Sequence, residues 1–163
     1  DASGETEAAA MARSVSERLR ELCGDLHLPI LDELGAGPAL DWLVGQVAGA
    51  TGEEVRLERS DAVRPPAGVE LAVFRVAQEA ISNAVKHGGP PVVVRYTTSP
   101  SAASLFVDDA GPGIDIGREP IAPKPGHYGL ASMQQRAEQI GALLSIRAWP
   151  GGGTRVALEW KAP

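Results

Sequence analysis

The chain has 163 residues, with 15 basic and 21 acidic side chains and a net charge of −6. This length favours a single domain, or one domain with a helical extension, and the acidic excess argues against nucleic acid as a partner. The single cysteine, Cys23, excludes an intrachain disulfide and a multi-cysteine metal site. No apolar run approaches membrane-spanning length, and the first residues do not resemble a signal peptide, so we expect a cytoplasmic domain.

Residues 1–27 predict a helical segment that is distinct from the remainder, residues 28–163. Its apolar residues recur every three or four positions, as on one face of a helix: Met11, Val15, Leu19, Leu22 and Leu26. Two interpretations of this stripe stay open. Either the helix packs on its own domain, or it is the tail of a dimerising helix from a longer protein.

The next part of the chain, up to residue 87, predicts two helices and one short strand. Pro29 and the cluster Gly35–Pro38 interrupt the chain, and a helix then runs from Pro38 to Ala50. Residues 55–58 alternate between apolar and charged side chains, as a strand does. A long amphipathic helix is expected over residues 69–87.

After residue 87 the apolar period changes to two, which predicts strands. We expect strands at 92–97 and 104–107, a Gly/Pro-rich loop at 110–127, a helix at 130–140, and a hairpin formed by 143–149 and 155–160. This order of elements predicts an α+β fold, a two-layer sandwich with its helices on one face of the sheet.

Three polar residues share one face of the long helix. At 100° per residue, Glu79, Asn83 and Lys86 fall within a narrow sector. An ordinary solvent-exposed face is the commoner cause of such a stripe. In the functional alternative, the Asn83 amide oxygen binds Mg²⁺, Glu79 positions a water or a hydroxyl, and Lys86 meets phosphate oxygens.

A carboxylate and two glycines follow the strand at 104–107. Asp109 accepts hydrogen bonds and cannot donate them, which would select an exocyclic amino group such as that of adenine. Gly111 and Gly113 would let the backbone approach a flat ring, because they have no Cβ. The plainer interpretation, an acidic surface turn, also fits these residues.

Two further glycine-containing stretches are candidates for nucleotide contacts. Residues 126–130, Gly-His-Tyr-Gly-Leu, come just before the helix predicted at 130–140, where free amide groups form an anion site. A loop bounded by these glycines would fold over a triphosphate as a lid. Thr154, which follows Gly152 and Gly153, supplies a hydroxyl that would reach the base.

In this order the motifs resemble those of the GHKL ATPases, a family that includes sensor histidine kinases, DNA gyrase, MutL and the heat-shock chaperone ATPases. Glu79-x-x-x-Asn83 resembles the N box, Asp109-x-Gly111-x-Gly113 the first glycine box, residues 126–130 the second, and Gly153-Thr154 the terminal one. Residues 74–87 and 126–137 are most similar to catalytic domains of two-component histidine kinases that act on LuxR-type response regulators. Residues 28–40 resemble their link between dimerising and catalytic domains.

The resemblance implies a Bergerat-type fold with a mixed sheet, and an ATP-binding catalytic domain over residues 28–163. It implies that Asp109 holds the adenine of ATP, that Asn83 binds Mg²⁺, and that Glu79 is a catalytic residue, either the base or a polarising residue. Lys86 is implied as a second catalytic residue, near the phosphates, because phosphoryl transfer asks for charge neutralisation. The other implied nucleotide contacts are His87, Gly111, Gly113, Gly126, His127, Tyr128, Gly129, Leu130 and Thr154.

The implied reaction transfers the γ-phosphoryl group of Mg-ATP to a histidine on a separate dimerisation domain, for relay to a response regulator. The implied parent protein is a homodimer attached to the inner membrane. His27 is followed by Leu28 rather than an acidic residue, and His87 and His127 lie within binding motifs, so we expect no phosphoacceptor in this chain. No Phe occurs between residues 115 and 126, where larger kinases carry one in the lid.

Two other functions stay open at this point. One is an anti-sigma-factor-type serine kinase, which has similar boxes in a compact domain, although the link-like stretch at residues 28–40 speaks against it. The other is a module that binds ATP without transferring phosphate. This second alternative is less expected, because Glu79, Asn83 and Lys86 are all present in the chain.

Overall fold

The computed structural model describes residues 29–113, 128–150 and 152–163. The helix predicted within residues 1–27 lies outside these ranges, as do most of the loop predicted at 110–127 and two predicted site residues, Gly126 and His127. The boundary between residues 27 and 28 therefore stays a prediction.

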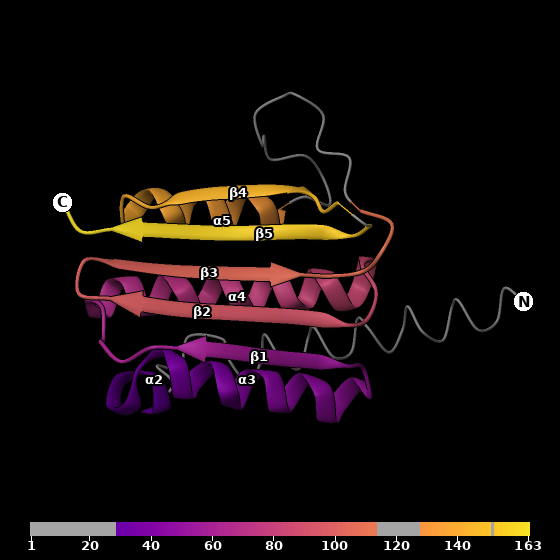
Figure 1. Ribbon diagram of the computed structural model, residues 1–163, viewed down its shortest axis with the longest axis horizontal. Helices are drawn as coiled ribbons and strands as arrows, with labels where there is room; N and C mark the ends of the chain where they lie inside the picture. The colour runs from indigo at the N-terminus through magenta and orange to yellow at the C-terminus, as the bar shows by residue number, and fades with distance from the viewer. Residues whose placement is uncertain (1–28, 114–127, 151) are drawn as a thin grey trace, which may run out of the picture.

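The described strands form one five-stranded sheet with the order β1-β2-β3-β5-β4 (Figure 1). Strand β1 runs parallel to β2, and the other neighbouring pairs are antiparallel. The sheet is therefore mixed, as the resemblance implied. The strands are β1 (Val55–Ser60), β2 (Val92–Ser99), β3 (Ala102–Asp108), β4 (Leu143–Ala148) and β5 (Thr154–Lys161).

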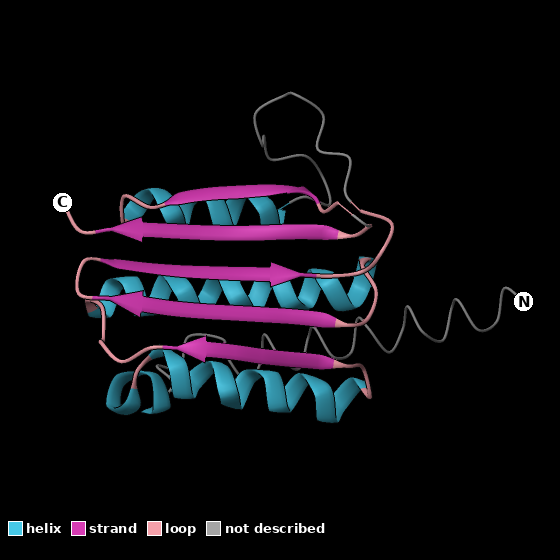
Figure 2. Cartoon of the chain, in the orientation of Figure 1, coloured by secondary structure: helices cyan, strands magenta, loops and turns pink. Residues whose placement is uncertain are grey.

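The helices of the described residues cover one face of this sheet, which gives two layers (Figure 2). They are α2 (Pro29–Leu34), α3 (Ala36–Thr51), α4 (Ala67–His87) and α5 (Tyr128–Gln139). The central helix, α4, contacts strands β2, β3 and β5, and it also packs against α3 and α5. The predicted α+β sandwich with helices on one face is confirmed.

We expected a break in regular structure between Pro29 and Pro38, and this prediction is wrong for most of the segment. The segment forms α2 and then the first turn of α3, and the break is confined to Gly35, whose φ is 91°. The Arg64 guanidinium donates hydrogen bonds to the last carbonyl oxygens of α2, those of Leu31, Asp32 and Glu33, at 3.3 Å each. These bonds give the carbonyl oxygens at the end of this six-residue helix the partners that they lack within the helix.

The first amide of α3 is also satisfied from a distance. Ala36 N donates to Glu70 Oε1 at 3.1 Å, which explains why α3 begins at Ala36 rather than at the expected Pro38. The buried Glu70 carboxylate in turn accepts Arg64 Nη2 at 2.7 Å. Arg64 and Glu70 thus join α2, α3 and the first turn of α4, and this group is called the Arg64–Glu70 clamp below.

The helix expected to begin at Leu130 begins two residues earlier, at Tyr128. Gly129 and Leu130 therefore lie in its first turn. Strand ends also differ from the predictions by one or two residues, as is usual for element boundaries.

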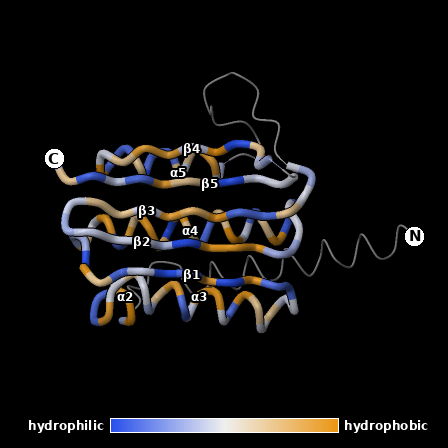
Figure 3. The backbone as a smooth tube through the Cα atoms, in the orientation of Figure 1, coloured by the Kyte–Doolittle hydropathy of each residue, from blue (hydrophilic) through white to orange (hydrophobic). Residues whose placement is uncertain are grey.

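Strand side chains alternate between the helix-covered face and the opposite face. In β2, Val92, Val94 and Tyr96 are buried beneath the helices, whereas Val93 and Arg95 point the other way. The apolar stretches of the strands and of α4 form the core between the two layers (Figure 3). The opposite face, called the outer face below, is covered by no helix of the described residues (Figure 1).

Candidate nucleotide-binding site

A cavity of about 540 Å³ lies between the C-terminal half of α4, the start of α5 and the adjoining ends of β3 and β5. Its volume falls in the range of small-molecule sites. Most of the predicted site residues line it: Glu79, Asn83, Lys86, His87, Asp109, Gly113, Tyr128, Gly129, Leu130 and Thr154. Gly111 is held beside it by a hydrogen bond to Asp109, and Gly126 and His127 lie outside the described residues.

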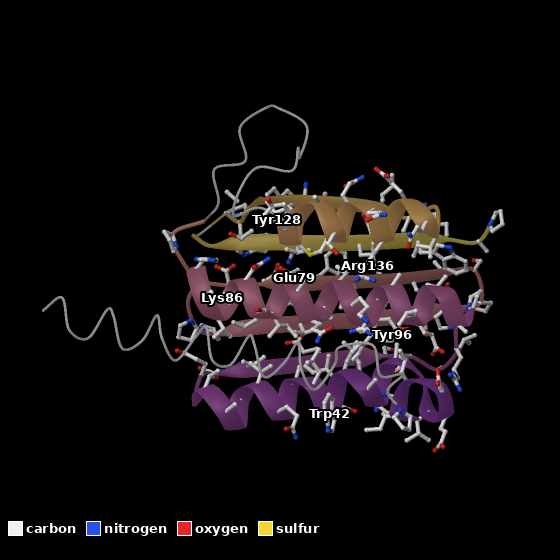
Figure 4. The ribbon with its side chains drawn as sticks, turned by 180° about the vertical axis from the view of Figure 1, so that it is seen from behind. Trp42, Glu79, Lys86, Tyr96, Tyr128 and Arg136 are labelled. Atoms are coloured by element: carbon white, nitrogen blue, oxygen red, sulfur yellow. The ribbon has the colours of Figure 1, made fainter. Side chains whose placement is uncertain are left out.

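The polar face of α4 forms one wall of this cavity. Glu79, Asn83 and Lys86 all line it, and all three are partly buried. Seen from the helix side, Glu79 and Lys86 lie on the edge of α4 that faces α5, and Tyr128 stands at the start of α5 (Figure 4). The structure thus turns this polar face toward a pocket instead of open solvent.

Asp109 lies on the opposite wall, just after the end of β3, and only 9% of it is exposed. Its Oδ1 accepts two backbone hydrogen bonds, from Gly111 N at 2.9 Å and Thr154 N at 3.2 Å. Its Oδ2 accepts none from the described residues. One oxygen therefore fixes the side chain, and the other remains able to accept a donor from a ligand in the cavity.

The glycines around Asp109 allow close approach of three backbone segments. A Cβ on Gly111 would lie 2.5 Å from the Gly88 backbone, and Ala110 N donates to Gly89 O at 2.9 Å. Gly153, with φ of 94°, faces the Asp109 carbonyl so closely that a Cβ would overlap it. The end of α4, the turn after β3 and the start of β5 therefore meet at Asp109, and side chains at these positions would separate them.

The floor of the cavity is apolar and was not among the predicted residues. It is formed by Val107, Ile146 and Val156 from the sheet together with Ala80 and Ala84 from α4. Such a floor suits a flat, largely apolar ring. The alternation of side chains along each strand identifies the residues on the helix-covered face, and this pattern could have predicted the three sheet residues.

The oxygen donors at this site fit a hard cation shared with a ligand. Among the described residues, no group of three or more His, Cys, Asp and Glu side chains is arranged to hold a metal ion. The Asn83 amide and the Glu79 carboxylate nevertheless both line the cavity. Mg²⁺ typically takes one or two protein oxygens and completes its shell with water and phosphate, so this donor set fits it.

The chain belongs to the family of histidine kinase-, DNA gyrase B- and HSP90-like ATPases, whose model matches residues 68–163. It is 33% identical to the sensor histidine kinase NarS of Mycobacterium tuberculosis over 153 residues, 93% of this chain and 35% of that protein. It is 29% identical to the nitrate/nitrite sensor protein NarQ of Escherichia coli over 148 residues, 89% of this chain and 25% of that protein. The chain spans about a third of the length of the first curated relatives that it matches.

Solved structures agree with this family. The ATP binding domain of PrrB from Mycobacterium tuberculosis is 30% identical, with a TM-score of 0.53, over 77% of this chain and 92% of that chain. The histidine kinase domain of a blue-light activated kinase from Erythrobacter litoralis shares the fold, with a TM-score of 0.57 and 17% identity, over 96% of this chain and 74% of that one. The chain is thus homologous to sensor histidine kinase catalytic domains, which confirms the resemblance.

None of the helices within residues 29–113, 128–150 and 152–163 is long and apolar enough to cross a membrane.

Proposed function

We propose that this chain binds Mg-ATP in the cavity between α4 and α5 and transfers the γ-phosphoryl group to a histidine on a separate dimerisation domain. The observation that carries the proposal is that Asp109 and Asn83, one predicted for adenine and one for Mg²⁺, line the same cavity from different elements. An acidic acceptor buried on one wall and an amide oxygen on the other suit the two ends of one nucleotide.

In this proposal Asp109 recognises the base. Its Oδ2 accepts the exocyclic amino group of adenine, and the ring lies over the floor formed by Val107, Ile146 and Val156. Gly113 and Thr154 border the same region and contribute contacts to the base. The hydroxyl of Thr154 and the bare backbone at Gly113 allow the ring to approach closely.

The triphosphate lies along α4 and under the start of α5. Lys86 and His87 lie at the C-terminal end of α4, where they offset phosphate charge, and Tyr128, Gly129 and Leu130 present the first-turn amides of α5. Gly126 and His127 complete this second glycine box. Mg²⁺ bound through Asn83 supplies further neutralisation of the phosphate charge.

Glu79 acts as the base in the transfer step. The acceptor imidazole nitrogen forms a bond to the γ-phosphorus, the bond to the oxygen bridging the β- and γ-phosphorus atoms breaks, and ADP leaves. Glu79 polarises the acceptor imidazole and takes the proton that it loses, while Lys86 steadies the charge on the transferred group. The phosphorylated histidine then serves a response regulator of the LuxR type.

We also propose that the catalytic domain spans residues 28–163 and that residues 1–27 belong to a dimerisation helix. The Arg64–Glu70 clamp supports this division, because it fastens α2 to the catalytic core. The parent protein is then a homodimeric, membrane-attached sensor kinase whose catalytic domain lies in the cytoplasm.

The test is transfer from γ-labelled ATP with the 163-residue chain and a dimerisation domain that carries its own histidine. We expect label on the added domain, acid-labile and alkali-stable as phosphohistidine is, and none on the chain alone. Acid-stable phosphoserine on a partner would favour a serine kinase instead. ATP binding without any transfer would favour a non-catalytic module, and label on His27 would contradict the expected lack of a phosphoacceptor.

A further inference from the structure

Asp108 and Asp109 are adjacent at the end of β3, and their side chains serve opposite faces of the sheet, because strand side chains alternate. Asp109 lines the cavity, whereas Asp108 lies on the outer face. Asp108 is nevertheless only 8% exposed. A buried carboxylate outside the cavity requires its own partners.

Arg155 of β5 supplies them. It stands directly opposite Asp108 in the β3–β5 register, and its guanidinium binds both carboxylate oxygens: Nε to Oδ1 at 2.5 Å and Nη2 to Oδ2 at 2.6 Å. Arg95 of β2 adds a third bond, from Nη1 to Oδ2 at 2.6 Å. A two-pronged arginine–carboxylate pair fixes geometry as well as charge. The bond to Asp108 also raises the pKa of Arg155.

Two aromatic rings hold the guanidinium of Arg155 in place. It lies 3.5 Å from the centroid of the Trp149 ring and 5.2 Å from that of Phe106. Trp149 belongs to the turn between β4 and β5, where its backbone N donates to Gly153 O at 2.9 Å. Arg155 therefore ties the start of β5 to the end of β3 and to this turn.

The residue before Arg155 connects this pair to the cavity. Thr154 N donates to Asp109 Oδ1 at 3.2 Å, and Asp109 N donates to Thr154 O at 3.0 Å. A shift of the start of β5 against β3 would move Thr154 N and turn the Asp109 carboxylate with it.

We propose that Asp108 and Arg155 are positioning residues for nucleotide recognition. Their pairing on the outer face fixes the start of β5 relative to the end of β3, and thereby orients the Asp109 carboxylate toward the amino group of adenine. Neither side chain touches the ligand. The inference rests on the proposed function, since it assigns adenine to Asp109.

The test compares two nucleotides on the 163-residue chain by calorimetry: ATP, and purine riboside triphosphate, which lacks only the exocyclic amino group. We expect the unmodified chain to prefer ATP by about 10- to 100-fold, the value of one hydrogen bond to a charged group. Arg155→Gln should reduce this preference by about three- to tenfold. The matched control is Arg147→Gln, which removes an exposed cation facing Arg155 from β4 and should leave the preference unchanged.

Equal weakening of both nucleotides by Arg155→Gln, or a lowered melting temperature with the preference intact, would show a purely structural pair and overturn the inference. A preference that Asp109→Asn abolishes but Arg155→Gln leaves intact would also overturn it, with the proposed function standing. If the unmodified chain binds neither nucleotide, both proposals fall. If Arg155→Gln does not fold, the same comparison is made with Arg155→Lys, which keeps the positive charge but cannot form the bidentate bond to Asp108. A reduced preference for ATP over purine riboside triphosphate then supports the inference, and an unchanged preference overturns it.

Discussion

Gly129, in the first turn of α5, lies so close to the Glu79 carboxylate of α4 that a Cβ built on Gly129 would overlap Glu79 Oε1. The two helices therefore meet at the proposed base itself, with no side chain between them. Any group added at Gly129 must move either Glu79 or the start of α5.

Gly129→Ala is expected to slow phosphoryl transfer by about 10- to 100-fold, because displacement of a reacting group by about 1 Å has costs of this order. Measurement uses labelled ATP with an added dimerisation domain. The matched control is Gly45→Ala on the exposed side of α3, where a Cβ meets nothing within 4 Å. It should leave transfer unchanged and raise the free energy of unfolding by about 0.5–1 kcal/mol. Equal transfer rates in the two variants would contradict the proposed place of Glu79.

Asp109→Asn is expected to weaken ATP binding by about 10- to 100-fold, since the amide retains the shape but lacks the charge that strengthens the bond to the adenine amino group. Titration calorimetry gives the dissociation constant. The control is Asp32→Asn on the exposed surface of α2. This variant should bind ATP with the same affinity as the unmodified chain. An unchanged affinity in Asp109→Asn would rule out Asp109 as the adenine acceptor.

Arg64→Gln is expected to lower the free energy of unfolding by clearly more than a variant that breaks an exposed ion pair, because it leaves the Glu70 carboxylate buried with one fewer charged partner and frees the carbonyl oxygens at the end of α2. Urea denaturation measures this loss. Arg56→Gln breaks the exposed pair with Glu54 and should change stability by no more than about 0.5 kcal/mol. Similar losses in both variants would mean that the clamp contributes no more than a surface ion pair.

Tyr96→Phe is expected to stabilise the fold and to change its response to alkali. The Tyr96 hydroxyl is buried without a hydrogen-bond partner among the described residues, so its removal should gain about 1 kcal/mol at pH 8. Burial also raises the pKa of Tyr96 above its ordinary 10.0. Above pH 10 the unfolded chain therefore ionises Tyr96 while the folded chain does not, which costs the unmodified protein about 1.4 kcal/mol of stability per pH unit.

The measurement for this variant is urea denaturation at pH 8 and pH 11. The advantage of Tyr96→Phe should grow between the two, since the phenylalanine chain lacks this titration. An advantage that is the same at both values would show that Tyr96 ionises equally in the folded and unfolded chains.

The layers of the fold and the polar residues that line the candidate site were predictable because their signals are local. The shift from a helical to an alternating period marked where α4 gives way to the strands. Asn83 and Asp109 stood out by residue type and position, one on the polar face of a helix and one at the end of a strand. Motif order then predicted that they would meet, and both line one cavity.

The features that escaped prediction depend on partners far away in the chain. α2 was missed because the carbonyl oxygens at its end accept hydrogen bonds from Arg64, which lies 31 to 33 residues downstream. No local sequence pattern predicts these bonds. Asp108 and Arg155 are 47 residues apart. Their pairing requires that β3 lie beside β5 and not beside β4, which the alternation of individual strands does not determine.

The clamp also sets how the chain enters this domain. Arg64 donates hydrogen bonds to the carbonyl oxygens at the end of α2, and the Glu70 carboxylate accepts bonds from both Arg64 and the first amide of α3. The end of α2 is therefore bonded to the first turn of α4, which lies about 20 Å along the helix axis from Asn83. α2 is thus attached, through two side chains, to the N-terminal end of the helix whose C-terminal half lines the candidate site.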